Sequence, residues 1–268
     1  MFKRLIFITH ITNDKKKNKI SICITCLNSE KTISKTLNSI LSQRSKPYEI
    51  IICDGFSSDQ TYEVIKKYQK KYKKLIKVYQ KKDSGISMGF NNTWKRAKGN
   101  FLLHLNSDDE LKPNAIKRLN ILTNKDSDFY VSSLIFKDHK EKIITPHLPN
   151  KKVISFRHPR VNHCGLLIKK SAMVKLNGYS SNFKVAMDIE IILRAIKLNY
   201  KFYISHVPIA IQNYGGYSSK NSIIGILELY QIECDFYYQN KINFLGKTFL
   251  IIILILRIIN IAIKKFNL

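Results

Sequence analysis

The stretch ISICITCLNSEKTISKTLNSILSQRSKPYEIIICD, residues 20–54, holds two short apolar runs that flank a segment with helical spacing. The runs ISICIT and YEIIIC are rich in isoleucine and have the length of buried strands. Between them, Ile33, Leu37, Ile40 and Leu41 recur at the spacing of one helix face. A strand, a helix and a second strand in this order form a βαβ unit with parallel strands. The stretch therefore predicts an α/β fold built on a parallel sheet.

The alternation continues beyond this unit and becomes less regular in the second half of the chain. The further expected elements are a helix over residues 61–72, a strand over 75–80, a helix over 86–98, a strand over 101–105, a strand, short helix and turn over 164–179, and a helix over 183–200. No low-complexity linker divides the chain. We therefore expect one α/β domain over residues 1–220 and a C-terminal helical appendage over residues 221–268.

Acidic or small polar residues follow the first four predicted strands. The segments CLNSE, DGFSSD, KKDSGIS and NSDDE contain Asp54, Asp83, Asp108 and Asp109. Ligands of such sheets bind beyond the carboxyl ends of the strands, so these carboxylates are expected along one edge. Adjacent carboxylates repel each other unless a cation lies among them. A metal ion is the functional interpretation, and helix caps or a solvated loop are the structural one.

The chain carries far more positive than negative charge, with 46 Lys and Arg against 19 Asp and Glu and a formal net charge of +27. Such a balance suits nucleic acid, an anionic membrane surface or an anionic substrate, and it also arises from lysine-rich solvated faces. Lysine runs such as KKYQKKYKK lack the interleaved arginine and aromatic residues of base-reading proteins. Specific nucleic-acid binding is therefore not expected.

The cysteines indicate buried, reduced thiols. Cys23 and Cys26 form a C-x-x-C pair without a second pair at zinc spacing, and the predicted strand points them to opposite faces. The odd total of five suits a reducing compartment. The N-terminal apolar run LIFI is too short for the core of a signal peptide. A cytoplasmic location is the resulting expectation.

The C-terminal segment GKTFLIIILILRIINIAIKKF is the most apolar part of the chain. Its longest uninterrupted apolar run, Phe249 to Leu256, is much shorter than the roughly 20 residues of a membrane-spanning helix. Arg257, Asn260 and Lys264 share one stripe of a helix. An amphipathic helix on an anionic membrane surface is the favoured interpretation. A short tilted span, a helix packed on the domain and an oligomer interface remain alternatives.

Two groups of motifs give the chain a family resemblance. The stronger group is SICITCLNSEKTISKTLNSILSQ, YEIIICDGFSSDQT and DSGISMGFNNTWKRAKGNFLLHLNSDDEL, and the weaker one is HCGLLIKKSA, NGYSSNF, MDIEIILRAI and YGGYS. In order and spacing they resemble family 2 glycosyltransferases of the GT-A fold, which move a sugar from a nucleotide donor with inversion. The resemblance implies a Rossmann-like fold with a donor-binding half over residues 19–115 and an acceptor-side half over residues 116–220.

The resemblance also implies roles for five residues in binding the donor or its metal ion. Thr25 and Asp54 match residues that hold the nucleotide base, usually uracil, and Asp83 matches a residue near the base and ribose. Asp108 and Asp109 match the acidic motif that binds Mg²⁺ or Mn²⁺ on the donor diphosphate. Where many relatives have Asp at the first position of that motif, this chain has Asn106. Which of the two following Asp residues contacts the metal therefore stays open.

On the acceptor side, the resemblance implies a general base at Asp188, with Glu190 as the alternative. Residues two apart on a helix do not share a face, so only one of them is expected to reach the acceptor. His163 is a candidate for orienting the acceptor or moving a proton, although a lone histidine is more often structural. Gly215 and Gly216 match a loop that lies near the donor in relatives, and an ordinary turn is the alternative.

The resulting hypothesis is an inverting, metal-assisted glycosyltransferase at the inner face of the cytoplasmic membrane. Its expected partners are a nucleotide-sugar donor, usually a UDP-sugar, and a glycan or polyprenyl-linked acceptor. The competing hypotheses are a nucleotidyltransferase and a non-catalytic basic protein that binds membrane or nucleic acid on a degenerate GT-A fold. The nucleotidyltransferase lacks support because no glycine-rich phosphate loop lies near the first strand. Nucleic-acid binding does not explain the acids at the strand ends, because these acids would repel phosphate unless a metal ion were bound.

Overall fold

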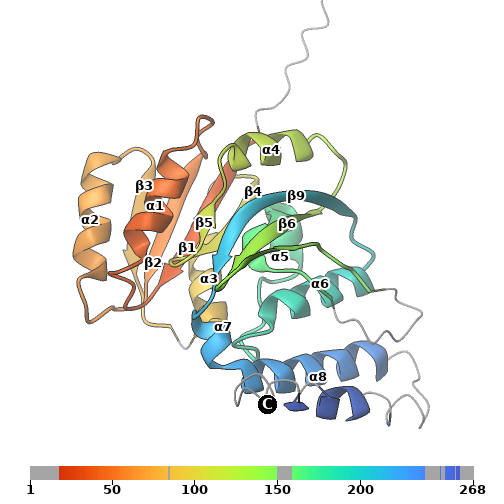
Figure 1. Ribbon diagram of the computed structural model, residues 1–268. Coiled ribbons are helices and arrows are strands. Elements are labelled where there is room, and N and C mark those ends of the chain that lie inside the picture. The colour runs from red at the N-terminus through yellow and green to blue at the C-terminus, as the bar shows by residue number, and fades with distance from the viewer. Residues whose placement is uncertain are drawn as a thin grey trace, which may run out of the picture.

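The computed structural model describes residues 18–83, 85–149, 159–238, 248, 251–256 and 258–259. Its centre is a nine-stranded sheet with helices on both faces (Figure 1). The strands are β1 (Ile20–Cys26), β2 (Glu49–Asp54), β3 (Ile76–Gln80), β4 (Phe101–Asn106), β5 (Glu110–Leu111), β6 (Phe129–Lys137), β7 (Glu141–Ile144), β8 (Leu166–Lys169) and β9 (Phe202–Asn213). The helices are α1 (Ile33–Leu41), α2 (Thr61–Lys71), α3 (Ile86–Trp94), α4 (Ala115–Leu122), α5 (Lys170–Lys175), α6 (Met187–Lys197), α7 (Tyr217–Lys220) and α8 (Ser222–Tyr238), and a 3₁₀ turn, η1, covers His163–Gly165.

The first four strands form the predicted parallel sheet in the order β3-β2-β1-β4. Each expected strand and helix between residues 20 and 106 is present, and α3 ends at Trp94 rather than at residue 98. In the register of β1 and β4, Thr25 lies opposite Asn106. The carboxyl ends of these strands are therefore adjacent, as the parallel arrangement requires.

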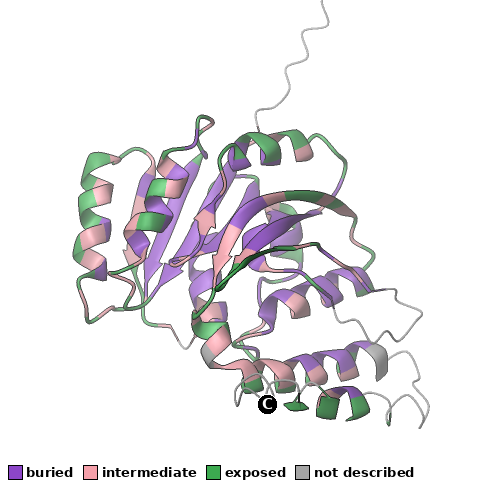
Figure 2. Ribbon diagram, in the orientation of Figure 1, coloured by how far each residue is buried: buried purple, intermediate pink, exposed green. Residues whose placement is uncertain are grey.

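Residues of β1 alternate between two hydrophobic cores, one on each face of the sheet. Ile22, Ile24 and Cys26 belong to the core under α1, α2 and α4, whereas Cys23 belongs to the core under α3, α5 and α6. Period-two alternation of side chains in a strand produces this division. Figure 2 shows the resulting buried sheet between helices with exposed outer faces. Trp94 is buried in the second core. The described cysteines are free thiols, as the sequence predicted, and all of them are buried except Cys234, which is half-buried.

Beyond β4 the sheet is mixed, and this part was less visible in the sequence. β8 is antiparallel to β4 and to β6, β9 is parallel to β6, and the two-residue β5 pairs antiparallel with β9. β6 and β9 were not predicted. Pro208 lies within β9, where it argues against a strand, and the pairing of β6 with β9 is irregular between Ser132 and Leu134.

The helix α8 packs along α6 near the C-terminal end of the described chain (Figure 1). Its Ile232 and Phe236 are buried in the core that α6 also lines, whereas Ile223, Ile224 and Leu227 are exposed. None of the described helices combines the length and apolar character needed to cross a bilayer. The predicted stripe of Arg257, Asn260 and Lys264 lies outside the described residues. A domain boundary at residue 220 stays a prediction.

Candidate active site

The acids that follow β4 lie beside the last residues of β9. After β4, Asp109 N–H donates to the Asn106 carbonyl at 3.3 Å and closes a turn. β5 then pairs with β9, which brings Asn213 to the two acids: its backbone N–H donates to Asp109 Oδ1 at 3.2 Å, and its Nδ2 donates to the Asp108 carbonyl at 2.6 Å. The Asp pair is therefore held by strand pairing and by Asn213.

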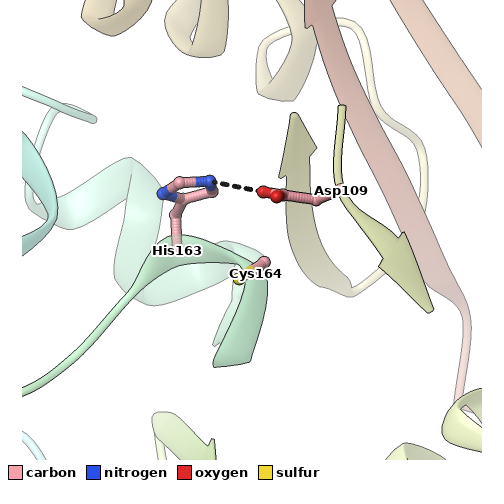
Figure 3. Close-up of side chains that lie close together, drawn as sticks. All are labelled: Asp109, His163 and Cys164. Carbon is pink, nitrogen blue, oxygen red and sulfur yellow. Dashed lines mark ion pairs between the residues drawn. The ribbon is translucent and has the colours of Figure 1, made fainter. Parts of the chain in front are cut away.

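A buried histidine joins these acids to the helix α6. His163 Nε2 lies 3.6 Å from Asp109 Oδ2, and its Nδ1 lies 3.7 Å from Asp188 Oδ2. Figure 3 shows His163 on η1 pointing toward Asp109, with Cys164 beside it. All three members of the Asp109–His163–Asp188 chain are buried. Phe90 of α3 packs on the imidazole with ring centroids 5.3 Å apart.

The two carboxylates beside His163 favour its positively charged form. Burial alone would lower the pKa of His163, but the carboxylates of Asp109 and Asp188 outweigh it and raise the pKa to about 9. Burial, together with the charge of His163, lowers the pKa of His104 to about 3. At neutral pH the structure therefore holds one imidazolium between two carboxylates and keeps the neighbouring imidazole neutral.

A second group of titratable atoms meets at the same place. One ligand atom each from Asp109, His163 and Cys164 lies within 4.8 Å of the others, which is compatible with a metal ion. Burial raises the pKa of the Cys164 thiol well above its usual range, and the nearby Asp109 and Asp188 add to this rise. A protonated thiol is a poor ligand for Mg²⁺ or Mn²⁺, which prefer oxygen. Carboxylate oxygens are therefore the better ligands here.

Three cavities open around the end of β4, and Asn106 lines each of them. We name the first the donor cavity because residues predicted to bind the donor line it; it has about 410 Å³, and its lining includes Thr25, Asp83 and Asp108. We name the second the acceptor cavity; it has about 230 Å³ and is lined by His163, Asp188, Arg160, Asn162 and Gln212 among others. A third cavity of about 420 Å³ is lined by Asp108, Asp109 and the start of α7, from Gly216 to Ser219, among others. Three of the predicted donor residues thus lie on one cavity, and the predicted acceptor-side residues His163 and Asp188 lie on another, with Asn106 lining both.

Two glycines permit close approach around the donor cavity. A Cβ on Gly89 of α3 would lie 2.2 Å from Thr25 Oγ1 and 3.1 Å from Asp83 Oδ2. A Cβ on Gly216 would lie 2.7 Å from Asp108 Oδ2. Any side chain at either position would push against a residue that lines the cavity. The predicted glycine loop therefore lies directly beside the acidic motif.

Asp54 occupies a different position from the other donor-side residues. It is fully buried, and its carboxylate accepts hydrogen bonds from Ser57 Oγ at 2.5 Å and from Gln80 Nε2 at 3.0 Å. Among the described residues that line the donor cavity, Asp54 does not occur. The structure places its side chain as a support for the loop after β2, and a contact with the nucleotide base stays a prediction.

The two candidate bases on α6 face different surroundings. Asp188 faces His163 and lines the acceptor cavity. Glu190 instead accepts two hydrogen bonds of 2.8 Å from Arg194, whose guanidinium also donates to backbone carbonyls at Leu176 and Gly178. Glu190 is thus held in a structural network away from the acceptor cavity.

Several lining residues gave no signal in the sequence. Asn213, Arg160, Gln212 and the hydroxyls of Ser218 and Ser219 come from segments that were read as irregular. The positions of Gln212 and Asn213 depend on the pairing of β9 with β5 and β6, which a local pattern does not reveal. Only YGGYS, through its paired glycines, pointed to this side of the site.

Comparisons with known proteins show which family this chain is similar to. The model of the family "Glycosyl transferase family 2" matches residues 21–174. The glycosyltransferase MJ1057 of Methanocaldococcus jannaschii is 23% identical over 252 residues, which are 89% of this chain and 86% of that one. The poly(ribitol-phosphate) beta-N-acetylglucosaminyltransferase TarS of Staphylococcus aureus is 31% identical over 101 residues, 37% of this chain and 18% of TarS.

Solved structures show the same fold at low sequence identity. The crystal structure of S. aureus TarS 1-349 in complex with UDP-GlcNAc has a TM-score of 0.61 at 18% identity, over 85% of this chain and 77% of that one. The mannosyltransferase PcManGT from Pyrobaculum calidifontis, in complex with GDP-Man and Mn²⁺, has a TM-score of 0.63 at 12% identity, over 81% and 63%. The predicted α/β fold is confirmed.

Proposed function

The chain belongs to glycosyl transferase family 2 and is a glycosyltransferase of the GT-A fold, and we propose that it transfers a sugar from a UDP-sugar to an acceptor hydroxyl with inversion. One observation carries the proposal: the donor cavity and the acceptor cavity meet at Asn106, with Asp108 on one side and Asp188 on the other. A single displacement needs the leaving diphosphate and the attacking hydroxyl on opposite sides of one carbon, and two cavities with a common wall supply that arrangement.

The donor cavity is proposed to bind the nucleotide and its diphosphate. TarS, which shares the fold, binds UDP-GlcNAc, and this supports UDP as the nucleotide. Thr25 and Asp83 line the cavity beside Gly89 of α3, and they supply a hydroxyl and a carboxylate that suit a base and ribose. Gly216 and Tyr217 border the same cavity next to Asp108. We therefore propose that the diphosphate of the donor lies near Asp108.

Asp108 is our proposed ligand for Mg²⁺ or Mn²⁺. It lines both the donor cavity and the neighbouring third cavity, whereas Asp109 is almost completely buried and faces His163. A hard divalent cation uses one or two protein carboxylates beside phosphate oxygens, so the residues present fit it. When bound, the ion would neutralise the charge that develops on the leaving diphosphate. PcManGT, which shares the fold, was solved with Mn²⁺.

Asp188 is our proposed general base. It lies on the acceptor cavity and is held by the imidazolium of His163, so its carboxylate is oriented toward that cavity. General-base assistance contributes about 10²- to 10⁴-fold to a rate. Glu190 is the weaker candidate because both of its oxygens are engaged by Arg194. His163 is proposed to orient the base rather than to accept the proton.

The acceptor is proposed to be a glycan or a polyprenyl-linked sugar at the inner face of the cytoplasmic membrane. Two features support this: the family relative TarS acts on poly(ribitol-phosphate), and this chain exposes Ile223, Ile224 and Leu227 of α8 together with isoleucines of residues 251–259. With a net charge of +27, such a surface suits anionic lipid. Co-sedimentation with phosphatidylglycerol vesicles, but not with phosphatidylcholine vesicles, is the expected result.

Thermal stabilisation tests the donor site. Purified protein is heated with UDP, GDP or CDP, each with and without Mn²⁺, because a ligand that binds the native state raises the melting temperature. UDP with Mn²⁺ is expected to give the largest rise, and Asp108→Ala and Asp83→Ala are expected to remove it. Asp126→Asn, a change at an exposed carboxylate that lines none of the three cavities, serves as the control. A wild type that responds to no nucleotide but to nucleic acid would contradict the proposal.

A further inference from the structure

Glu228 of α8 accepts hydrogen bonds from three successive backbone N–H groups in front of α6. Its Oε1 accepts from Lys184 at 2.7 Å, and its Oε2 accepts from Val185 at 2.8 Å and from Ala186 at 2.9 Å. Ala186 is the residue directly before the first turn of α6. A carboxylate at this place satisfies donors that lack partners within the helix and interacts favourably with the positive end of the helix dipole.

The same segment is held by close packing and by a contact from the donor side. A Cβ on Gly225, three residues before Glu228, would lie 2.8 Å from Val185 Cγ1, so α8 approaches the segment as closely as a glycine allows. From the other direction, Ser87 of α3 donates a hydrogen bond to the Phe183 carbonyl. Residues 183–186 are therefore held between α8 and α3, the helix that borders the donor cavity.

The held segment leads directly to the proposed base. Asp188 follows Ala186 by two residues, and Val185, Met187, Asp188 and Ile189 all line the acceptor cavity. The backbone at the start of α6 thus sets where the Asp188 carboxylate lies relative to His163, 3.7 Å away. A displacement of about 1 Å in a reacting group can reduce a rate by as much as about a hundredfold.

We infer that Glu228 is a positioning residue for the transfer reaction: it fixes the start of α6 so that Asp188 faces the acceptor cavity. Glu228 acts through the backbone and through Asp188, and it does not touch the reacting atoms. Since the base role of Asp188 is itself proposed, this role rests on the proposed function. It also gives α8 a part in the active site, although the helix lies outside the segment that the family model matches.

Hydrogen exchange tests the hydrogen bonds from residues 184–186 to Glu228, which we call the clamp, without any assay of activity. Glu228→Gln keeps the shape of the side chain but turns one acceptor oxygen into an NH₂ group that faces backbone N–H donors. Amide exchange within residues 184–186 is expected to rise about tenfold or more, because one of the two acceptor oxygens is lost and the other no longer carries carboxylate charge, while exchange in β1 to β4 stays unchanged. Asp235→Asn, at an exposed carboxylate of the same helix, is the matched control and should leave exchange at the wild-type rate. Unchanged exchange in Glu228→Gln would overturn the clamp.

The turnover rate then tests whether the clamp positions Asp188 for the reaction. The readout is UDP release from UDP-glucose and UDP-N-acetylglucosamine with Mn²⁺ and water as the acceptor. Glu228→Gln is expected to lower kcat about tenfold and to leave the affinity for UDP unchanged. In an Asp188→Asn background the same change should cost nothing further, because Glu228 acts through Asp188.

The possible failures can be told apart. Faster exchange with an unchanged kcat would overturn the positioning role, and so would an equal loss of kcat in the Asp188→Asn background. A wild type that binds UDP with Mn²⁺ but releases none from either donor would contradict the proposed function, while the faster exchange would still support the clamp. A return of exchange and kcat to wild-type values when glutamate is restored at position 228 would support both roles.

Discussion

Buried carboxylates lie at both edges of the parallel sheet: the amino edge, where β1 to β4 begin, and the carboxyl edge, where these strands end. The two edges differ in how completely their buried carboxylates are hydrogen-bonded. At the amino edge, Glu49 at the start of β2 is 1% exposed, and its Oε1 accepts hydrogen bonds from Ser21 Oγ at 2.8 Å and from backbone N–H groups of Lys98 and Gly99. Its Oε2 pairs with Lys77 Nζ at 2.5 Å. Both oxygens of Glu49 are thus fully engaged within the fold.

At the carboxyl edge, some buried polar atoms make no hydrogen bond. Asp109 Oδ2 and His163 Nε2 are buried, have no hydrogen-bond partner among the described residues, and face each other at 3.6 Å. A buried polar atom without a partner costs about 1–3 kcal/mol, so such atoms are rare unless something else completes them. The comparison teaches that the amino edge is closed by its own hydrogen bonds, whereas the proposed site at the carboxyl edge keeps buried polar atoms that make none.

The largest expected effect is on catalysis at the carboxyl edge. Asp188→Asn removes the proposed base and is expected to lower kcat for UDP release about 10³-fold, or about 4 kcal/mol in transition-state free energy. The far-UV spectrum and the affinity for UDP should not change. Glu190→Gln is the comparison on the same helix. If it lowered kcat as much as Asp188→Asn, the assignment of the base would be wrong.

The next effect is on stability at the amino edge. Glu49→Gln breaks a buried, charge-paired network and is expected to lower the free energy of unfolding by about 3 kcal/mol, measured by urea denaturation. The kcat of the folded fraction should stay at the wild-type value. Asp126→Asn, which removes an exposed pair with Lys201, should leave the denaturation midpoint unchanged. If Glu49→Gln lowered kcat without lowering stability, the amino edge would contribute to activity, which would contradict this account.

The pH dependence of this stability has a defined sign. Burial alone would raise the pKa of Glu49, but hydrogen bonds from Lys77, Lys98 and Ser21 outweigh it and hold the pKa below its usual value of 4.5. The stability from Glu49 is therefore present above pH 4.5 and is lost as the pH falls through the folded pKa. The difference in unfolding free energy between wild type and Glu49→Gln should shrink in acid. A difference that is constant down to pH 3 would contradict this account.

A smaller loss of activity is expected when His163 is changed. His163→Gln removes the charge that links Asp109 with Asp188 and is expected to lower kcat about 30-fold, as for residues that orient catalytic groups. The affinity for UDP with Mn²⁺ should fall less than kcat. Cys164→Ser, a change in the adjacent residue, should leave kcat within a few-fold of wild type. An equal effect of both substitutions would indicate disturbed packing instead.

The smallest effects come from paired glycine substitutions. Gly89→Ala would place a Cβ 2.2 Å from Thr25 Oγ1 and is expected to weaken UDP binding about tenfold, or by about 1.4 kcal/mol. Gly99→Ala would place a Cβ 2.4 Å from Ser21 Oγ at the amino edge and should reduce stability without changing the affinity for UDP. Calorimetric titration and urea denaturation of both variants separate the outcomes. Interchanged effects would contradict the comparison.

The sequence predicted the first half of the fold because its signals are local. Each strand from β1 to β4 has its own apolar run, and each intervening helix has its own apolar face, so the parallel order follows from short-range pattern. β9 escaped prediction because Pro208 interrupts it and because its pairing with β6 shifts register. Long-range pairing of that kind leaves little trace in single-sequence periodicity.

The candidate site was predictable to a similar extent. Position after a strand end predicted Asp83 and Asp108 at one edge of the sheet, where both line the donor cavity, and the family resemblance added Thr25. It could not show that Gln80, the residue opposite Asp54 in the neighbouring strand, would engage the Asp54 carboxylate. Nor could it show that Asn213 and Glu228, more than 100 and 40 residues from their partners at Asp108 and Lys184, would hold the site in place.

The most direct test of the central claim is calorimetric binding of UDP, with and without Mn²⁺, to the wild type, Asp108→Asn and Glu49→Gln. We predict that UDP binds the wild type tightly only with Mn²⁺, that Asp108→Asn abolishes the effect of the metal, and that folded Glu49→Gln binds as the wild type does. If Asp108→Asn bound UDP with Mn²⁺ as tightly as the wild type, the carboxyl edge would not be the metal-assisted donor site.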